Sequence, residues 1–129
     1  MEISERLMKL GRMLDELSGN WIFVEGQRDR KALAGLGLVN ILTISGNLRS
    51  SCMRLAGKDV EKVYVLTDLD RRGYQLAMMA RDELEGMSIK ADLRMRGDLA
   101  YALGIKNFED AKRAYDSLKE EYEKGGKYG

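Results

Sequence analysis

The sequence lacks histidine and proline and contains a single cysteine among its 129 residues. Without histidine it has neither the commonest general base nor imidazole ligands for zinc, and one cysteine excludes an internal disulfide or a cysteine-built zinc site. Any bound metal would have oxygen ligands, which favours magnesium, manganese or calcium. No segment approaches the ~20 apolar residues of a membrane span, and the N-terminus lacks the pattern of a secretory signal. We therefore expect a cytoplasmic protein that does not enter the membrane.

The composition is that of a globular protein, with 44% hydrophobic and 33% charged residues. A chain of 129 residues suits one domain with a single core, so we expect residues 1–129 to form that domain. The formal net charge of +1 neither favours nor excludes a nucleic-acid partner, and only the placement of the basic residues is informative.

Two acids, Asp68 and Asp70, follow the apolar run 63–66, which predicts a buried strand. Burying a carboxylate without a partner costs several kcal/mol or more, so acids at such positions usually face a cleft, a cation or a metal. The alternative is that these two acids form a turn and a helix N-cap, which aspartate does well. This stretch alone leaves both interpretations open.

Apolar periodicity predicts helices that alternate with short strands. The expected strands cover residues 21–24, 40–45, 63–66 and, as a weaker edge strand, 90–95. The expected helices are amphipathic ones at the N-terminus (2–18) and the C-terminus (107–123), with others over 29–36, 46–55 and 74–85. A loop with a helical turn is expected over 97–103 and a frayed tail over 124–129. This order predicts an α/β fold with about four mostly parallel strands and helices on both faces.

Three acids leave the predicted strands at their carboxyl ends, where parallel sheets bind ligands. Glu25 follows the first strand, and Asp68 and Asp70 follow the third, so the three converge if these strands are neighbours. Three carboxylates in one cleft repel one another unless a divalent cation lies among them. Gly26 and Gly73 would let the backbone turn tightly and approach a phosphate closely.

Basic residues lie close to the same strand ends. Four arginines directly follow strands, namely Arg28, Arg49, Arg71 and Arg72, and Arg94 and Arg96 come after the fourth strand. The planar fork of arginine suits phosphate oxygens, so we expect the first four to bind phosphate. The alternative is that a chain this rich in charge scatters arginines over its surface. Asp29 is expected to cap or start the helix that follows the first strand.

Two segments together carry a family resemblance, Val24-Glu25-Gly26-Gln27-Arg28-Asp29 and Thr67-Asp68-Leu69-Asp70-Arg71-Arg72-Gly73. This pairing resembles the Toprim domain, a Rossmann-like fold shared by topoisomerases, DnaG-type primases, overcoming-lysogenisation-defect nucleases, RecR recombination proteins and ribosomal RNA maturases. The resemblance covers residues 21–96, and the chain looks most like a small stand-alone archaeal or bacterial Toprim protein. It implies that Glu25 is a general acid or base and metal ligand. It also implies that Asp68 and Asp70 bind Mg²⁺, often as two ions, which Mn²⁺ can replace.

The chain departs from the topoisomerase pattern at Arg72, where topoisomerases carry a further glutamate that would hold the second metal. Primases and maturases also lack that acid, so the pattern resembles those branches. Asp98 could compensate, although an ordinary loop or cap role fits it better. The chain has neither the separate tyrosine domain of a topoisomerase nor the cysteine zinc module of a DnaG-type primase, so alone it is expected to be neither enzyme.

We therefore expect magnesium-dependent hydrolysis of phosphodiester bonds in DNA or RNA, through Glu25, Asp68 and Asp70. The alternative is a non-catalytic module that binds metal and nucleic acid or recruits a protein partner, which would supply substrate recognition. A phosphatase or receiver domain is less favoured, because both place their acids after the first strand. The sequence indicates neither the oligomeric state nor a choice between DNA and RNA.

Overall fold

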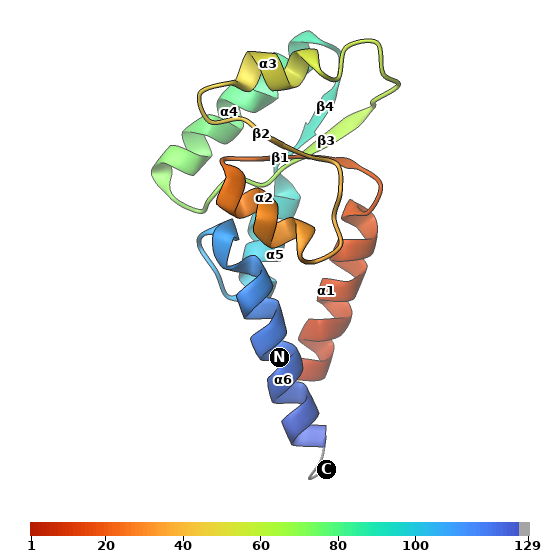
Figure 1. The fold of residues 1–129 in the computed structure, drawn as a ribbon, viewed down its shortest axis with the longest axis vertical. Coiled ribbons are helices and arrows are strands. Elements are labelled where there is room, and N and C mark those ends of the chain that lie inside the picture. The colour runs from red at the N-terminus through yellow and green to blue at the C-terminus, as the bar shows by residue number, and fades with distance from the viewer. Residues whose placement is uncertain (127–129) are drawn as a thin grey trace.

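A computed structural model of the chain describes residues 1–126 and has a four-stranded sheet between two layers of helices (Figure 1). The strands are β1 (Trp21–Val24), β2 (Ile41–Thr43), β3 (Lys62–Val65) and β4 (Lys90–Asp92). The helices are α1 (Ile3–Leu17), α2 (Gln27–Ala34), α3 (Leu48–Met53), α4 (Arg71–Gly86), α5 (Arg94–Leu103) and α6 (Ala111–Gly126), with a 3-10 helix, η1 (Phe108–Asp110), before α6. Within residues 1–126, no helix is long and apolar enough to cross a membrane.

The four strands run parallel in the order β2-β1-β3-β4, so the predicted α/β class is confirmed. β1 occupies the centre of the sheet beside β3, where Phe23 lies opposite Val65. Strands that follow one another in the chain are therefore joined by a helix that packs on one face of the sheet: α2 joins β1 to β2, α3 joins β2 to β3, and α4 joins β3 to β4. Because β1 and β3 are neighbours, the segments that follow them, with Glu25 and Asp68, emerge side by side.

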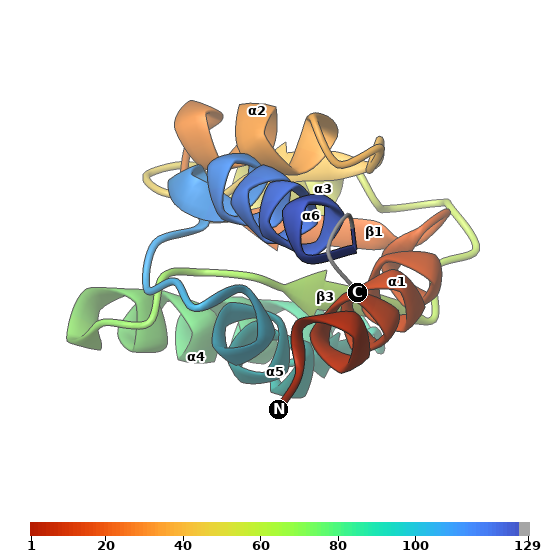
Figure 2. The ribbon, with the colours of Figure 1, turned by 90° about the horizontal axis from the view of Figure 1, so that it is seen from below.

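Side chains of β1 and β3 alternate between two apolar cores, because helices cover both faces of the sheet. Phe23, Val63 and Val65 face the layer of α3 and α4, which lies above the sheet in Figure 1. Ile22, Val24 and Tyr64 face the larger layer below it. Figure 2 views that layer directly and shows α2 beside α6 and α5 beside α1.

The fourth strand is shorter than predicted, and the helix after it is longer. β4 ends at Asp92, whose Oδ1 accepts a hydrogen bond from the Met95 N–H at 2.9 Å in the turn that leads into α5. Residues 97–103, predicted to be a loop with a helical turn, form the body of α5. Met95, Leu99 and Leu103 recur at helical spacing and are buried, so tertiary packing decides the conformation here.

The two terminal helices close the larger layer. α1 matches the predicted amphipathic helix within one residue at each end. At the other terminus the predicted helix over 107–123 is divided into η1 and α6, and α6 continues to Gly126, where a frayed tail was predicted. The rest of that predicted tail, 127–129, lies outside the described residues.

Candidate functional site

The carboxyl ends of β1 and β3 bring Glu25 and Asp68 into direct contact. The Oε2 atom of Glu25 accepts a hydrogen bond from the Asp68 backbone N–H at 2.7 Å, although 43 residues separate the two in sequence. This contact follows from the neighbouring positions of β1 and β3 in the sheet. One Glu25 oxygen is therefore bound to backbone, which leaves Oε1 for a ligand.

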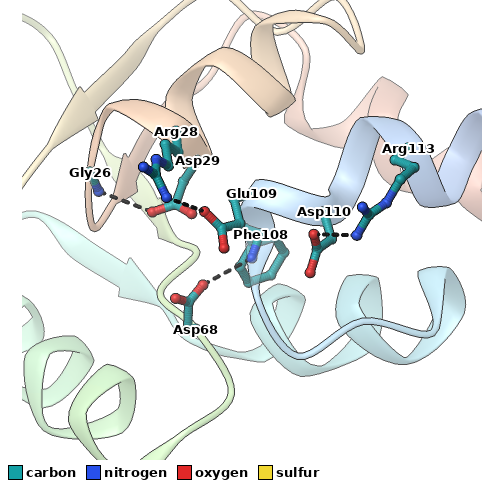
Figure 3. A network of polar contacts seen from close by, with 8 residues as sticks. All are labelled: Gly26, Arg28, Asp29, Asp68, Phe108, Glu109, Asp110 and Arg113. Atoms are coloured by element: carbon teal, nitrogen blue, oxygen red, sulfur yellow. Dashed lines mark hydrogen bonds and ion pairs between the residues drawn. The ribbon is translucent and has the colours of Figure 1, made fainter.

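The C-terminal part of the chain holds Asp68 from a second direction. Asp68 Oδ1 accepts a hydrogen bond from the Phe108 N–H at 2.9 Å (Figure 3). Partial burial raises the pKa of Asp68, and the negative charges of Glu25 and Asp70 raise it further, while the hydrogen bond from Phe108 opposes these effects. The carboxylate is thus fixed in position, and ionising it costs more free energy than ionising an exposed aspartate.

Asp70 is the N-cap of α4. Its backbone is extended, and its Oδ1 accepts a hydrogen bond from the Gly73 N–H at 2.6 Å. The capping alternative considered for this stretch is therefore present in the structure. It explains why α4 begins at Arg71 and not at residue 74. A cap uses one carboxylate oxygen, so the second remains compatible with a metal-binding role.

Gly26 and Gly73 were predicted to allow tight turns near a phosphate, and the structure gives each a different environment. Gly73 is buried in the first turn of α4, where an added Cβ would lie 2.7 Å from the Asp68 carbonyl carbon and closer still to its oxygen. Gly73 therefore lets the Asp68 backbone pack against the helix. Gly26 has a φ of −144°, which is extended backbone that any residue adopts. A Cβ at Gly26 would meet open space, so no tight turn requires glycine there.

Asp29 starts α2, in agreement with its predicted role. Its side chain is buried, and its Oδ2 accepts a hydrogen bond from the Gly26 N–H at 3.0 Å, one half of a capping box (Figure 3). Burial raises the pKa of Asp29, the hydrogen bond from Gly26 opposes that change, and the charges of Asp68 and Glu109 add to it. A buried helix cap thus lies next to the acids of the sheet edge.

A hollow of about 440 Å³ opens where these elements meet, and we call it the sheet-edge hollow. Its lining residues are Glu25, Gly26, Gln27, Arg28, Asp29, Ser45, Asp68, Arg72, Asn107 and Glu109. Of the four arginines predicted to bind phosphate, the structure brings Arg28 and Arg72 to this hollow. Arg49 and Arg71 are exposed and are not among its lining residues.

Glu109, at the centre of η1, is an acid of the hollow that the sequence analysis did not identify. Glu109 is far in sequence from the predicted motifs, and no sequence pattern links it to them. It reaches the site because η1 packs on α2. Asp98, considered as a compensating acid, lies elsewhere on α5, where its Oδ2 is 3.6 Å from Arg94 Nε. Glu109 and not Asp98 is therefore the additional carboxylate near Glu25 and Asp68.

Arg96 has a specific role that its place among the basic residues after the fourth strand did not indicate. Its Nε donates to the Thr67 carbonyl oxygen at 2.7 Å and its Nη2 to the Asp68 carbonyl oxygen at 2.5 Å. Burial lowers the pKa of Arg96, while the charges of Asp70 and Glu25 oppose that change. The guanidinium thus fixes residues 66–70 between β3 and α4, which we call the acid-bearing loop, and it faces the negative charges of that loop.

Replacing Arg96 with methionine is expected to lower the free energy of unfolding by about 2 to 3 kcal/mol, because two loop carbonyls lose charged donors. Arg94→Met is the matched control, since the Arg94 side chain is 90% exposed and pairs with Asp98 only at the surface. That change should cost less than ~0.5 kcal/mol. Urea denaturation monitored by circular dichroism measures both, and equal effects would contradict the role given to Arg96.

The donor chemistry of the hollow suits a hard divalent cation. Carboxylate oxygens are the ligands that Mg²⁺ prefers, and Glu25 and Asp68 each have one oxygen outside the hydrogen bonds to backbone. A bound cation would also relieve the repulsion that raises the pKa of Asp68. Within the described part of the chain, no three acidic or cysteine side chains already have the arrangement of a metal site. Binding would therefore require side-chain rotation.

Comparisons with known proteins agree with this architecture. The Toprim domain family matches residues 20–97. A UPF0292 protein of Pyrococcus furiosus is 34% identical over 118 residues, which cover 89% of this chain and 88% of that protein. A UPF0292 protein of Methanocaldococcus jannaschii is 31% identical over 105 residues, covering 77% and 82%. The solved structure of a protein from Aquifex aeolicus aligns with a TM-score of 0.67 and 26% identity, over 78% of this chain and 96% of that one.

The family match includes all four strands and both acidic segments, and it ends before η1. A Toprim domain implies a metal-dependent function connected with nucleic acids, and such domains typically bind divalent metals such as Mg²⁺. The matches to the curated relatives extend over most of both chains. The chain therefore belongs to the Toprim domain family and to the UPF0292 proteins.

Proposed function

We propose that this protein hydrolyses phosphodiester bonds of nucleic acid in a magnesium-dependent reaction at the sheet-edge hollow. The observation that carries the proposal is the contact of Glu25 with Asp68 in a hollow that Arg28 and Arg72 also line. Acids from two neighbouring strands and basic residues from two helix starts suit a site for a metal-bound phosphate.

Glu25, Asp68 and Asp70 would hold the cation, with two ions as the number that the family resemblance implies. When bound, Mg²⁺ neutralises charge on the phosphate and lowers the pKa of a coordinated water. Glu25 is the proposed general base, since its Oε1 is outside the hydrogen bond with Asp68 and the residue lines the hollow. In hydrolysis the oxygen of the attacking water would bond to phosphorus and its proton would pass to this Glu25 oxygen, while the bond from phosphorus to the leaving oxygen breaks and the leaving oxygen takes a proton from solvent.

Arg28 and Arg72 are the proposed phosphate-binding residues of the hollow. Both lie in the first turn of a helix, α2 and α4 respectively, where helix N-termini also favour anions. Their side chains are exposed, so a substrate can reach them. Arg49 and Arg71 lie outside the hollow, and we propose that they contact the nucleic acid farther along its backbone.

A non-catalytic module that binds metal and nucleic acid, or recruits a partner, is the second candidate. It is favoured by the way that Asp68 and Asp70 each use a carboxylate oxygen to fix the protein's own backbone. Such contacts stabilise the acid-bearing loop whether or not chemistry follows. Retained nucleic-acid binding with no turnover on any substrate or metal would select this candidate.

The test is cleavage of end-labelled single-stranded DNA, double-stranded DNA and RNA with Mg²⁺ or Mn²⁺, with and without EDTA. We expect cleavage that EDTA abolishes and that Glu25→Gln reduces by about 10²- to 10⁴-fold. Glu85→Gln, at an exposed position near the far end of α4, is the matched control and should retain full activity. Equal cleavage by wild type and Glu25→Gln would overturn the catalytic role, and a trapped aspartyl-phosphate at Asp68 would indicate a phosphatase.

A further inference from the structure

Glu109 comes from a segment that lies outside the Toprim match, which ends at residue 97. Two hydrogen bonds to the acid-bearing loop and one buried side chain hold this segment in place. The Leu69 N–H donates to the Lys106 carbonyl oxygen at 2.8 Å, the Phe108 N–H donates to Asp68 Oδ1 at 2.9 Å, and the Phe108 side chain is fully buried. The position of Glu109 is therefore set by the same loop that carries Asp68.

The Glu109 side chain is turned into the sheet-edge hollow. Figure 3 shows its carboxylate beside that of Asp29 and on the side of Asp68. Its partner is Arg28, whose Nη1 is 3.8 Å from Glu109 Oε2 and whose side chain is 88% exposed. An ion pair this long and this exposed contributes at most ~1 kcal/mol, so a ligand can replace it at little cost.

The other acids of the hollow are more firmly engaged. Glu25 and Asp68 each give one oxygen to a backbone N–H, and buried Asp29 gives one to Gly26. Asp70 caps α4 and is not among the lining residues. Within residues 1–126, Glu109 is thus the lining carboxylate whose side chain contacts only an exposed arginine, Arg28. Mg²⁺ and Mn²⁺ prefer such anionic oxygens.

We propose that Glu109 is a further ligand of the divalent cation bound at the hollow, supplied from beyond the Toprim region. This inference rests on the proposed function, because it requires a cation at the site of Glu25 and Asp68. Binding of Glu109 to the cation releases Arg28, which is then available for a phosphate group of the substrate. The segment that includes η1 therefore completes the site in addition to packing against α2.

The test measures Mn²⁺ affinity directly, by electron paramagnetic resonance of free Mn²⁺ and by calorimetry, without substrate. Glu109→Gln is expected to weaken binding about tenfold or more. Asp110→Asn is the matched control: it removes the same charge from the adjacent residue, whose carboxylate pairs with Arg113 at 2.6 Å and does not line the hollow. It should leave the affinity within about twofold of wild type. Circular dichroism checks that each variant is folded.

The Glu109→Asp variant distinguishes direct binding of the cation from a general effect of negative charge, because it keeps the charge and shortens the side chain by one methylene group. We expect it to weaken Mn²⁺ binding as well, whereas wild-type affinity in this variant would overturn the ligand role. Equal affinities for wild type and Glu109→Gln would overturn it too, and would leave the proposed function intact. If wild type itself binds no Mn²⁺, both the metal-dependent function and this inference fail, so the two failures are distinguishable.

Discussion

Replacing Asp68 with asparagine is expected to reduce cleavage by about 100-fold or more and yet to raise the stability of the metal-free protein at pH 7. Asparagine keeps the Oδ1 that accepts the Phe108 N–H, so the link to the C-terminal segment survives. It removes the negative charge that a cation would need. It also removes a half-buried charge that Glu25 and Asp70 repel.

The raised pKa of Asp68 determines whether Asp68→Asn stabilises or destabilises the protein at a given pH. Burial and neighbouring acids raise the pKa of Asp68 above its ordinary value of 3.8 in the folded protein, so protons bind more tightly to the folded state. The stability that Asp68 contributes is therefore fully present below pH 3.8 and is lost as pH rises through the folded pKa. Asp68→Asn should unfold at higher urea concentration than wild type at pH 7, and the difference should disappear below pH 3.8.

Asp98→Asn is the control for both measurements, because Asp98 is exposed on α5 and its ion pair is with Arg94 at the surface. This change should alter neither cleavage nor the pH dependence of unfolding. Added Mg²⁺ should stabilise wild type more than Asp68→Asn, because a bound cation relieves the repulsion in wild type only. If Asp68→Asn were less stable than wild type at pH 7, the description of Asp68 as a costly charge would be wrong.

The sequence predicted those features that depend on local pattern. The four apolar residues from Trp21 to Val24 form β1 with the predicted bounds. Alternation of strands with helices was sufficient to predict a parallel sheet, and the convergence of Glu25 with Asp68 was predicted on the condition that β1 and β3 are neighbours, which the structure shows. These features follow from the spacing of residues a few positions apart and from the handedness of parallel crossovers.

Features that depend on packing between distant segments could not be predicted in this way. Glu109 reaches the hollow only because η1 packs on α2, and Arg96 reaches the acid-bearing loop only because 94–103 is helical. The sequence pattern of 90–95 predicted a strand up to residue 95. Residues 94 and 95 instead belong to α5, because the helix buries Leu99 in the core. Gly73 was expected to serve a phosphate, and the contact that requires it lies within the protein.

Replacing Gly73 with alanine is expected to lower the free energy of unfolding by about 2 to 3 kcal/mol, although alanine favours helices. The added Cβ would overlap the Asp68 carbonyl group. That group cannot move away easily, because Arg96 binds its oxygen at 2.5 Å and Glu25 binds the Asp68 N–H at 2.7 Å. Any shift that accommodates the methyl group would also displace the Asp68 carboxylate, so cleavage should fall together with stability.

Gly97→Ala is the matched control, because Gly97 also lies in the first turns of a helix, α5, and is exposed. A Cβ at Gly97 meets nothing within 4 Å, so this variant should be as stable as wild type or about 0.5 to 1 kcal/mol more stable. Urea denaturation of the two variants compares the same chemical change in two environments. If Gly73→Ala proved as stable as Gly97→Ala, the acid-bearing loop would have to move enough to make room for the added methyl group. The fixed geometry of Glu25, Asp68 and Arg96 would then be incorrect as a description of the free protein.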